Sequence, residues 1–111
     1  MNDVGFIVAG SPRLVSAAIE QYADEQRIVS AIVVPWESDR ARLSMAVTSV
    51  KSDGWAIEHT NLGTISLTDL GNELTRVAIV AHEPDHPERQ KLAALFDRFA
   101  RQLQSTFEVA P

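Results

Sequence analysis

The last long segment of the chain, Pro87 to Phe107, distributes apolar and polar residues with the period of an α-helix. Its apolar residues recur every three or four positions, which places them on one helical face. This stripe consists of Leu92, Leu95, Phe96, Phe99, Leu103 and Phe107. Asp85 or His86 can cap the start, and proline suits the first helical position. The pattern predicts an amphipathic helix, about 30 Å long, that lies against a wide apolar surface.

The beginning of the chain combines a short apolar run with a helix start signal. The run Val4–Ala9 is bounded by Gly10, which is typical of a short strand. Ser11 can then cap a helix that has Pro12 at its first position. The apolar stripe of this helix is Leu14, Val15, Ala18, Ile19, Tyr22 and Ala23. We therefore predict a strand followed by a helix of about four turns with one buried face.

Between Arg27 and Ala81 the pattern changes to a period of two, which is typical of β-strands. The predicted strands are Ile28–Val34, Leu43–Thr48, Trp55–Thr60, Thr64–Asp69 and Thr75–Ala81. Ser52-Asp53-Gly54 is a hairpin signal, and we interpret Asn61-Leu62-Gly63 as a second turn. Such short connections favour antiparallel pairing. With Val4–Ala9, the pattern predicts a single α+β domain over residues 1–111, in which an antiparallel sheet of about six strands packs on the long C-terminal helix and one shorter N-terminal helix is added.

Composition narrows the classes of partner. The formal net charge is -5 and the pI is about 5.0, so no surplus of basic residues is present to replace the counterions of a nucleic acid. We therefore expect no nucleic-acid partner. No run approaches the roughly 20 apolar residues of a membrane span, and the start lacks the basic region of a signal peptide. With no cysteine, the chain has no disulfide, and we expect a cytoplasmic protein.

One segment matches a metalloprotease pattern by letter. His82-Glu83-Pro84-Asp85-His86 fits H-E-x-x-H, a motif that binds zinc only when both histidines lie on one helical face. Pro84 cannot lie within such a helix. We interpret the segment as a polar loop between the last strand and the long helix, and a loop that binds zinc or nickel through His82, Asp85 and His86 is the less favoured alternative. No spacing marks an activated serine or a catalytic carboxylate pair, so we assign no catalytic residue, metal or cofactor, and enzymatic activity stays uncertain.

The order of the elements resembles a known superfamily. A first strand and a helix opening with Ser11-Pro12, antiparallel strands that include Gly63–Val77, and a long C-terminal helix are similar to the START-like or helix-grip superfamily, in particular its polyketide cyclase and lipid-transport branch. The resemblance implies that a curved sheet grips the C-terminal helix and that a hydrophobic cavity lies between them. This chain is shorter, with one helix after the first strand where members usually have two, and one strand fewer.

The candidate binding residues come from one strand face and the long helix. Trp55, Ile57 and His59 alternate with Ala56, Glu58 and Thr60. If the first face points at the helix, its side chains meet the helical stripe beside Met45, and His59 can bind the polar group of a ligand. The predicted lining is Met45, Trp55, Ile57, His59, Phe96, Phe99 and Leu103. The alternative is that these residues simply fill the core, and we expect Glu58 to pair with Arg76 on the opposite face.

Three functional hypotheses follow. The leading one is a protein that binds a small hydrophobic or aromatic molecule between the sheet and the C-terminal helix. The second is a protein–protein interaction module without catalysis, acting as a homodimer or subunit, which Trp36 and the edge of a small open sheet suggest. The third is an enzyme of cyclase or hydrolase type that uses His59 as acid or base.

Overall fold

The computed structural model describes residues 4–53 and 56–109, with the side chains of residues 52, 53 and 56 outside this description. The elements follow one another as β1 (Val4–Ala9), α1 (Pro12–Gln26), β2 (Val29–Val33), the short 3₁₀ helix η1 (Pro35–Glu37), β3 (Arg42–Asp53), β4 (Ala56–Gly71), β5 (Leu74–Ala81) and α2 (Arg89–Phe107). The sequence pattern predicted this order of strands and helices, apart from the division of one strand.

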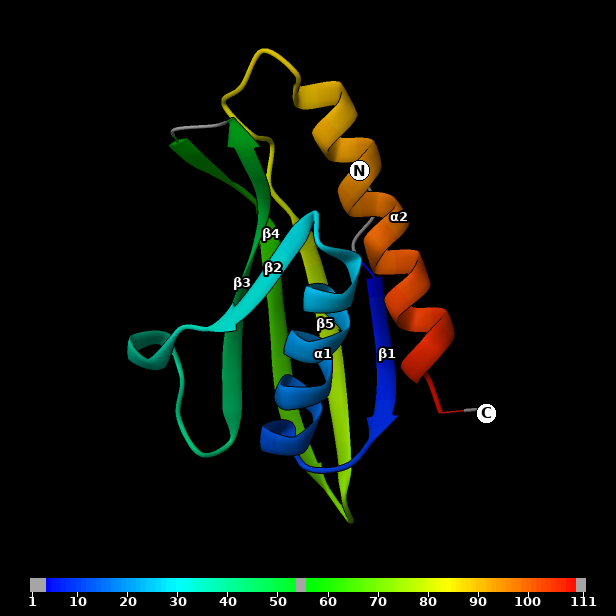
Figure 1. Ribbon diagram of the computed structural model, residues 1–111. Helices are drawn as coiled ribbons and strands as arrows, with labels where there is room; N and C mark the ends of the chain where they lie inside the picture. Colours follow the sequence, from blue (N-terminus) through cyan, green and yellow to red (C-terminus); the bar gives the residue numbers. More distant parts are fainter. Residues whose placement is uncertain (1–3, 54–55, 110–111) are drawn as a thin grey trace.

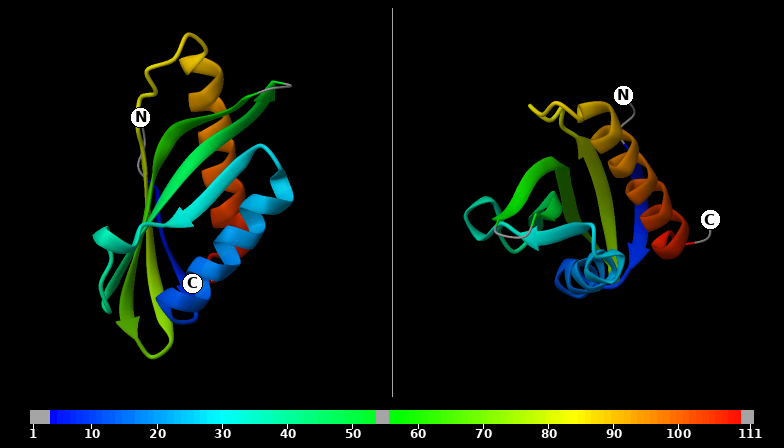
Figure 2. Two further views of the ribbon diagram at one scale, coloured as in Figure 1. Left: turned by 60° about the vertical axis from the view of Figure 1, so that its left-hand side comes forward. Right: turned by 45° about the horizontal axis from the view of Figure 1, so that its top comes forward.

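The five strands form one antiparallel sheet in the order β1-β5-β4-β3-β2. Consecutive strands from β2 to β5 are neighbours, and β1 joins the sheet beside β5 (Figure 1). Both α-helices lie on the same face of this sheet, and in the described part of the chain no α-helix covers the opposite face (Figure 2). The predicted α+β class and antiparallel sheet are confirmed.

The predicted strand count of six is wrong by one. The segments Trp55–Thr60 and Thr64–Asp69 belong to the single long strand β4, because the expected turn at Asn61-Leu62-Gly63 is a bulge within that strand. A bulge inserts one unpaired residue and leaves the chain direction unchanged. Turn-forming residues therefore mark an irregularity of the strand here and do not end it.

A continuous hydrophobic core fills the space between the sheet and the helices. Alternate residues of each strand and one stripe of each helix contribute the buried residues Phe6, Val8, Val15, Ile19, Ala23, Val29, Ala31, Met45, Val47, Leu62, Ile65, Leu67, Val77, Ile79, Phe96, Phe99, Ala100 and Leu103. Tyr22 of α1 joins the helices: its ring stacks on Phe99 at 6.0 Å and meets Phe107 edge-on at 5.8 Å. Such aromatic pairs stabilise beyond the area they bury.

Local signals explain where α1 begins and why α2 begins later in the sequence than predicted. Ser11 is the N-cap of α1 and its hydroxyl accepts from the Leu14 N–H at 3.3 Å, as the sequence predicts. The α2 helix begins at Arg89, with Glu88 as N-cap, two residues later than the predicted start at Pro87. The His86 side chain accepts a hydrogen bond from the backbone N–H of Glu88, and this bond fixes the segment before α2 in a turn.

Both edges of the sheet are partly closed. On β2, the carboxylate of Glu20 from α1 accepts from the Val33 N–H at 3.3 Å. On β1, the segment after α2 bridges Val8 through Glu108, and the Val109 N–H donates to the Ile7 carbonyl at 2.8 Å. Edge groups occupied in this way are less available to another strand.

The core packing predicts a large effect of truncating Leu103, which is fully buried between α2 and the sheet. Replacement of Leu103 by Ala should lower the free energy of unfolding by about 2–5 kcal/mol, because the lost contacts leave a cavity. Urea unfolding followed by circular dichroism measures this change. Leu14→Ala is the control: Leu14 is 68% exposed on α1, and an effect of similar size there would contradict the assigned core.

Candidate functional site

The bulge in β4 reverses which face its residues occupy. Val47 of β3 pairs with Gly63 and Thr48 with Asn61, so Leu62 is the extra residue. Leu62 is buried in the core. The part of β4 that precedes the bulge, residues 56–61, is called the β4 arm. Because one inserted residue shifts the alternation of side chains, Glu58 and Thr60 lie on the helix side of this arm.

The residues expected on the helix side of this arm lie elsewhere. Ile57 is 65% exposed, and His59 is exposed too. Glu58 bonds His86, in the segment that leads into α2. The expectation that Ile57 and His59 face the long helix, and that Glu58 pairs with Arg76 on the other face, is therefore wrong. The bulge is the physical reason why these side chains lie on faces other than the predicted ones.

Gly63 allows α2 to approach the sheet at the bulge. A Cβ built on Gly63 would lie 2.5 Å from Cζ of Phe96 and 2.5 Å from the carbonyl oxygen of Val80. Separations of that size are prohibited for real side chains, so only glycine permits the ring of Phe96 to rest on the β4 backbone. The contact fixes the height of α2 above the sheet.

An apolar pocket of about 490 Å³ opens beside this contact. The strands supply Val4, Leu62, Ile79 and Ala81, and α2 supplies Leu92, Ala93, Phe96 and Ala100. Alanine at positions 93 and 100 leaves space where larger side chains would reach the sheet. The pocket therefore lies between β1, β5, β4 and the part of α2 from Arg89 to Ala100.

Polar side chains occupy one part of the pocket wall. They are His82, Glu83, Arg89, Gln90 and Asp97. The carboxylate of Asp97 is already paired with Arg101 at 2.9 Å. Arg89 and Glu83 bring opposite charges to the same wall, which favours a ligand whose polar end forms hydrogen bonds over one with a strong net charge.

A second, more polar hollow lies on the other side of the segment that precedes α2. It has a volume of about 550 Å³ and is lined by Glu58, His59, Thr60, Asn61, His82, Glu83, Pro84, Asp85 and His86. His82, Glu83 and Pro84 line both hollows. The segment 82–84 therefore separates an apolar pocket from a polar one.

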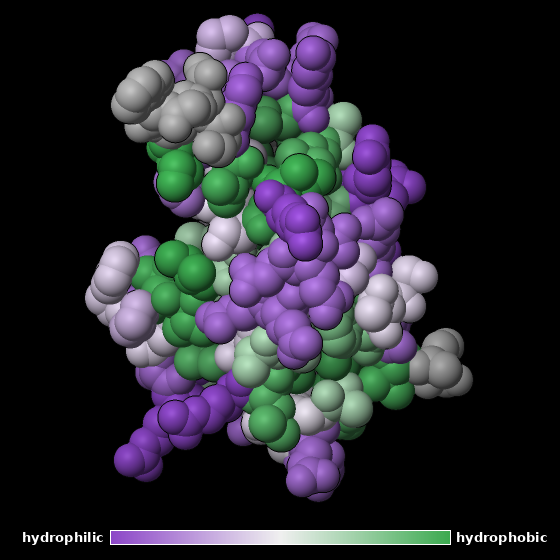
Figure 3. Space-filling view, in the orientation of Figure 1, coloured by the Kyte–Doolittle hydropathy of each residue, from purple (hydrophilic) through white to green (hydrophobic). Residues whose placement is uncertain are grey.

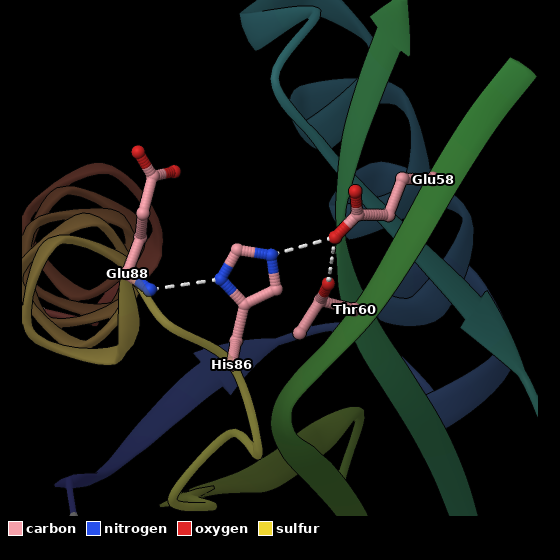
Figure 4. Close-up of polar contacts among 4 residues, drawn as sticks. All are labelled: Glu58, Thr60, His86 and Glu88. Atoms are coloured by element: carbon pink, nitrogen blue, oxygen red, sulfur yellow. Dashed lines mark hydrogen bonds and ion pairs between the residues drawn. The ribbon is translucent and has the colours of Figure 1, made fainter.

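His86 connects the β4 arm to the start of α2 (Figure 4). Its Nδ1 accepts from the Glu88 N–H at 3.0 Å, so Nε2 carries the ring proton and donates it to Oε1 of Glu58 at 2.7 Å. The same carboxylate oxygen accepts from the Thr60 hydroxyl at 3.4 Å. Since both ring nitrogens form hydrogen bonds, His86 is suited to holding these elements together.

The H-E-x-x-H segment has the loop conformation that its proline predicts. Residues 82–88 connect β5 to α2 outside either element. Nε2 of His82 lies 3.3 Å from the Thr64 hydroxyl, whereas His86 bonds Glu58. Among the described residues, no three His, Cys, Asp or Glu side chains gather in a group that could hold a metal ion. The two histidines thus contact different parts of the sheet.

Among the described residues, those proposed from sequence as a ligand lining do not line one pocket. Phe96 alone among them lines the apolar pocket, while His59 lines the polar hollow. Met45, Phe99 and Leu103 are buried in the core, and Ile57 faces solvent. Trp55 lies outside the described residues.

The pocket residues that sequence reasoning missed belong to three groups. Leu92 was recognised on the helical stripe, and Ile79 and Ala81 on one face of their strand, but nothing in the pattern assigned them to an opening. Leu62 was interpreted as part of a turn. The small residues on α2, Ala93 and Ala100, were a signal that could have been used, because they mark where the helix leaves space.

Comparison with known proteins supports the fold. No protein-family model and no curated protein matches the chain. Among solved structures, the fold is similar to the vertebrate conserved region of human METTL16, with a TM-score of 0.55 and 14% sequence identity over 94% of this chain and 96% of that chain. The likeness shows an α+β fold of the same extent and leaves the ligand and partner to be argued from the site. No helix in the described part of the chain is long and apolar enough to cross a membrane.

Substitution of Gly63 tests the close approach of α2. Gly63→Ala should lower the free energy of unfolding by about 1–3 kcal/mol, because the added methyl group must displace Phe96 and the backbone of β5. Thermal and urea unfolding measure the change. Gly5→Ala is the matched control, since its Cβ would meet no atom closer than 3.8 Å; equal effects of the two substitutions would refute the Gly63–Phe96 constraint.

Removal of the His86 side chain tests the link between the arm and α2. His86→Ala deprives the Glu88 N–H and the Glu58 carboxylate of a partner, and should destabilise the fold by about 1 kcal/mol, a modest value because Glu58 is half exposed to solvent. Amide hydrogen exchange should accelerate in the first turn of α2. Exposed His59, replaced by Ala, is the control, and unchanged exchange in His86→Ala would count against the link.

Proposed function

We propose that this protein binds a small, largely apolar molecule in the pocket between the sheet and the part of α2 from Arg89 to Ala100. The observation that carries the proposal is the pocket itself, about 490 Å³ in volume and walled by aliphatic and aromatic side chains of four elements. Ligand sites typically have volumes of about 300–1,000 Å³ with mostly apolar walls and few polar groups. The pocket matches that description.

The walls indicate how a ligand would be oriented. Its apolar body would pack on Leu62, Leu92 and Phe96, which line the pocket. A hydroxyl, carbonyl or amide at its other end would reach Gln90 or Arg89. We infer that the preferred ligand is amphipathic and carries a hydrogen-bonding group of low net charge.

The proposed site differs from the one predicted from sequence in its residues and in most of its strands, although both lie between the sheet and the C-terminal helix. We further propose that the chain is a shortened relative of the helix-grip superfamily, whose cavity lies between the sheet and the C-terminal helix. The proposal includes no catalytic step. His59, the residue considered as acid or base, lines the polar hollow and does not line the apolar pocket.

Filling the pocket with a larger side chain should weaken ligand binding. In Ala93→Trp, the indole would occupy the space between α2 and the sheet, so an uncharged apolar probe such as N-phenyl-1-naphthylamine should bind at least tenfold more weakly than to the parent protein. Fluorescence titration of the probe measures the affinity. Native mass spectrometry of the freshly purified parent protein would show a retained natural ligand directly.

Ala94→Trp is the matched control for this experiment. Ala94 is the next residue on α2, is exposed and does not line the pocket, so its substitution adds the same indole outside the site. We expect saturable binding of one probe per chain for the parent and for Ala94→Trp. Non-saturable binding to the parent, or equal loss in both variants, would contradict the proposed function.

A further inference from the structure

In the described part of the chain, the β4 arm has β3 on one side and no strand on the other. β4 pairs with β5 only from Gly63 onward, and one further bond runs from the His82 N–H to the Leu62 carbonyl at 2.9 Å. From there the arm and the segment 82–88 diverge, as Figure 1 and Figure 2 show. The arm is therefore a two-stranded projection with one open side.

The register of the sheet shows which backbone groups lie on this open side. The Val50 N–H donates to the Ile28 carbonyl at 3.0 Å, so the backbone groups of Val50 face β2. Its partner on β4 is His59. Directly opposed residues of an antiparallel pair point their backbone groups either both toward each other or both away, so the N–H and C=O of His59 face the open side. Those of Ile57, two residues away, point the same way.

The other two edges of the sheet are partly closed. Glu20 accepts from an amide of the β2 edge, and residues 108–109 bond β1. Unpaired edge groups are a template for another strand, and proteins usually protect them. In the described part of the chain, no backbone group covers Ile57 or His59 on the open side. The β4 arm is therefore the edge best suited to accept a strand.

A hollow of about 550 Å³ runs along this open side. The four consecutive residues 58–61 line it, and residues 82–86 lie opposite. Because successive side chains point to opposite faces of a strand, a hollow that contacts all four lies along the edge of the arm and not over one face. The hydrogen bond between Glu58 and His86, at 2.7 Å, joins the two sides near the start of α2 (Figure 4).

The walls of the hollow favour a single extended chain as its occupant. Paired strands lie about 4.8 Å apart, and the segment 82–86 bounds the hollow on the side away from the arm. The edge of a folded sheet carries further strands behind the first and would collide with this segment. The arm of a second copy would collide too, because it brings β3 with it.

The charged side chains of the hollow indicate the chemistry of this occupant. The acidic ones are Glu58, Glu83 and Asp85, and among the described residues no lysine or arginine lines the hollow. In Figure 3, the end of the molecule where the segment 82–88 lies is mainly hydrophilic. The net charge of -5 also attracts a basic segment from a distance. Lysine or arginine in the added strand would therefore complement these carboxylates.

We propose that the open side of the β4 arm binds an extended basic segment of a partner protein, which becomes a sixth strand of the sheet. The backbone groups of Ile57 and His59 form its hydrogen bonds, and the carboxylates around the hollow favour its basic side chains. The apolar pocket lies on the other side of the segment 82–84, so the added strand and a pocket ligand occupy different space.

A fluorescein-labelled heptapeptide of alternating lysine and valine is the probe for this proposal. Fluorescence anisotropy should show saturable binding to the parent protein. The same peptide with glutamate in place of lysine should bind roughly tenfold more weakly, because like charges then oppose one another. Amide NMR shifts caused by the lysine peptide should centre on residues 57–61 and 82–86. No saturable binding, equal affinity for both peptides, or shifts centred elsewhere would overturn the proposal.

Two substitutions of His59 separate its backbone from its side chain. His59→Pro removes the N–H on the open side, and pairing with β3 should persist because that N–H faces away from β3. His59→Ala removes the same imidazole and keeps the N–H. The lysine peptide should bind roughly tenfold more weakly to the proline variant than to the alanine variant, because a hydrogen bond is lost. Circular dichroism establishes that both are folded, and equal affinities would contradict strand addition.

Asp85→Lys tests the charge preference without changing the strand. The lysine peptide should bind more weakly to this variant than to the parent, and the glutamate peptide more tightly. Glu25→Lys is the matched control, since Glu25 is exposed on α1 and its substitution makes the same change in net charge. Equal effects of the two substitutions would show that net charge alone governs binding and would refute the proposed surface.

Discussion

The contact between Phe96 and Gly63 is the constraint on which the rest of the structure depends. This contact requires three local features. Gly63 has no Cβ, the bulge places Leu62 in the core beside it, and the helical stripe of α2 places the Phe96 ring against the Gly63 backbone. Close packing leaves little freedom once such a contact is formed. The position of α2 over β4 and β5 is set here.

The hollows on either side of the segment 82–84 follow from that constraint. Since Phe96 holds α2 near the sheet, the small residues Ala93 and Ala100 leave a space toward β1, which becomes the apolar pocket. The bulge also turns Glu58 toward the helix, where it meets His86 and secures the first turn. One irregular position in a strand thus determines both where an apolar ligand could lie and which polar groups surround it.

The order of elements, their antiparallel pairing and both helical stripes could be predicted from sequence, because each depends on local periodicity and turn chemistry. The site could not. Residues 61–63 have the composition of a turn, and only pairing with β3 and β5 shows that β4 continues through them. Once that bulge was missed, alternation placed Ile57 and His59 on the wrong face. An opening between packed elements is likewise a property of tertiary structure, to which Ala93 gave only a weak clue.

The central claim is that an apolar molecule binds beside the Phe96–Gly63 contact. Methyl NMR during titration with N-phenyl-1-naphthylamine tests it most directly, because the methyl groups of Leu62, Ile79 and Leu92 line the pocket while those of Met45 and Leu103 lie in the closed core. Binding in the pocket should cause saturable shifts of Leu62, Ile79 and Leu92 and leave Met45 and Leu103 unshifted. Shifts centred on Met45 and Ile57, or no saturable shift at any methyl group, would contradict it.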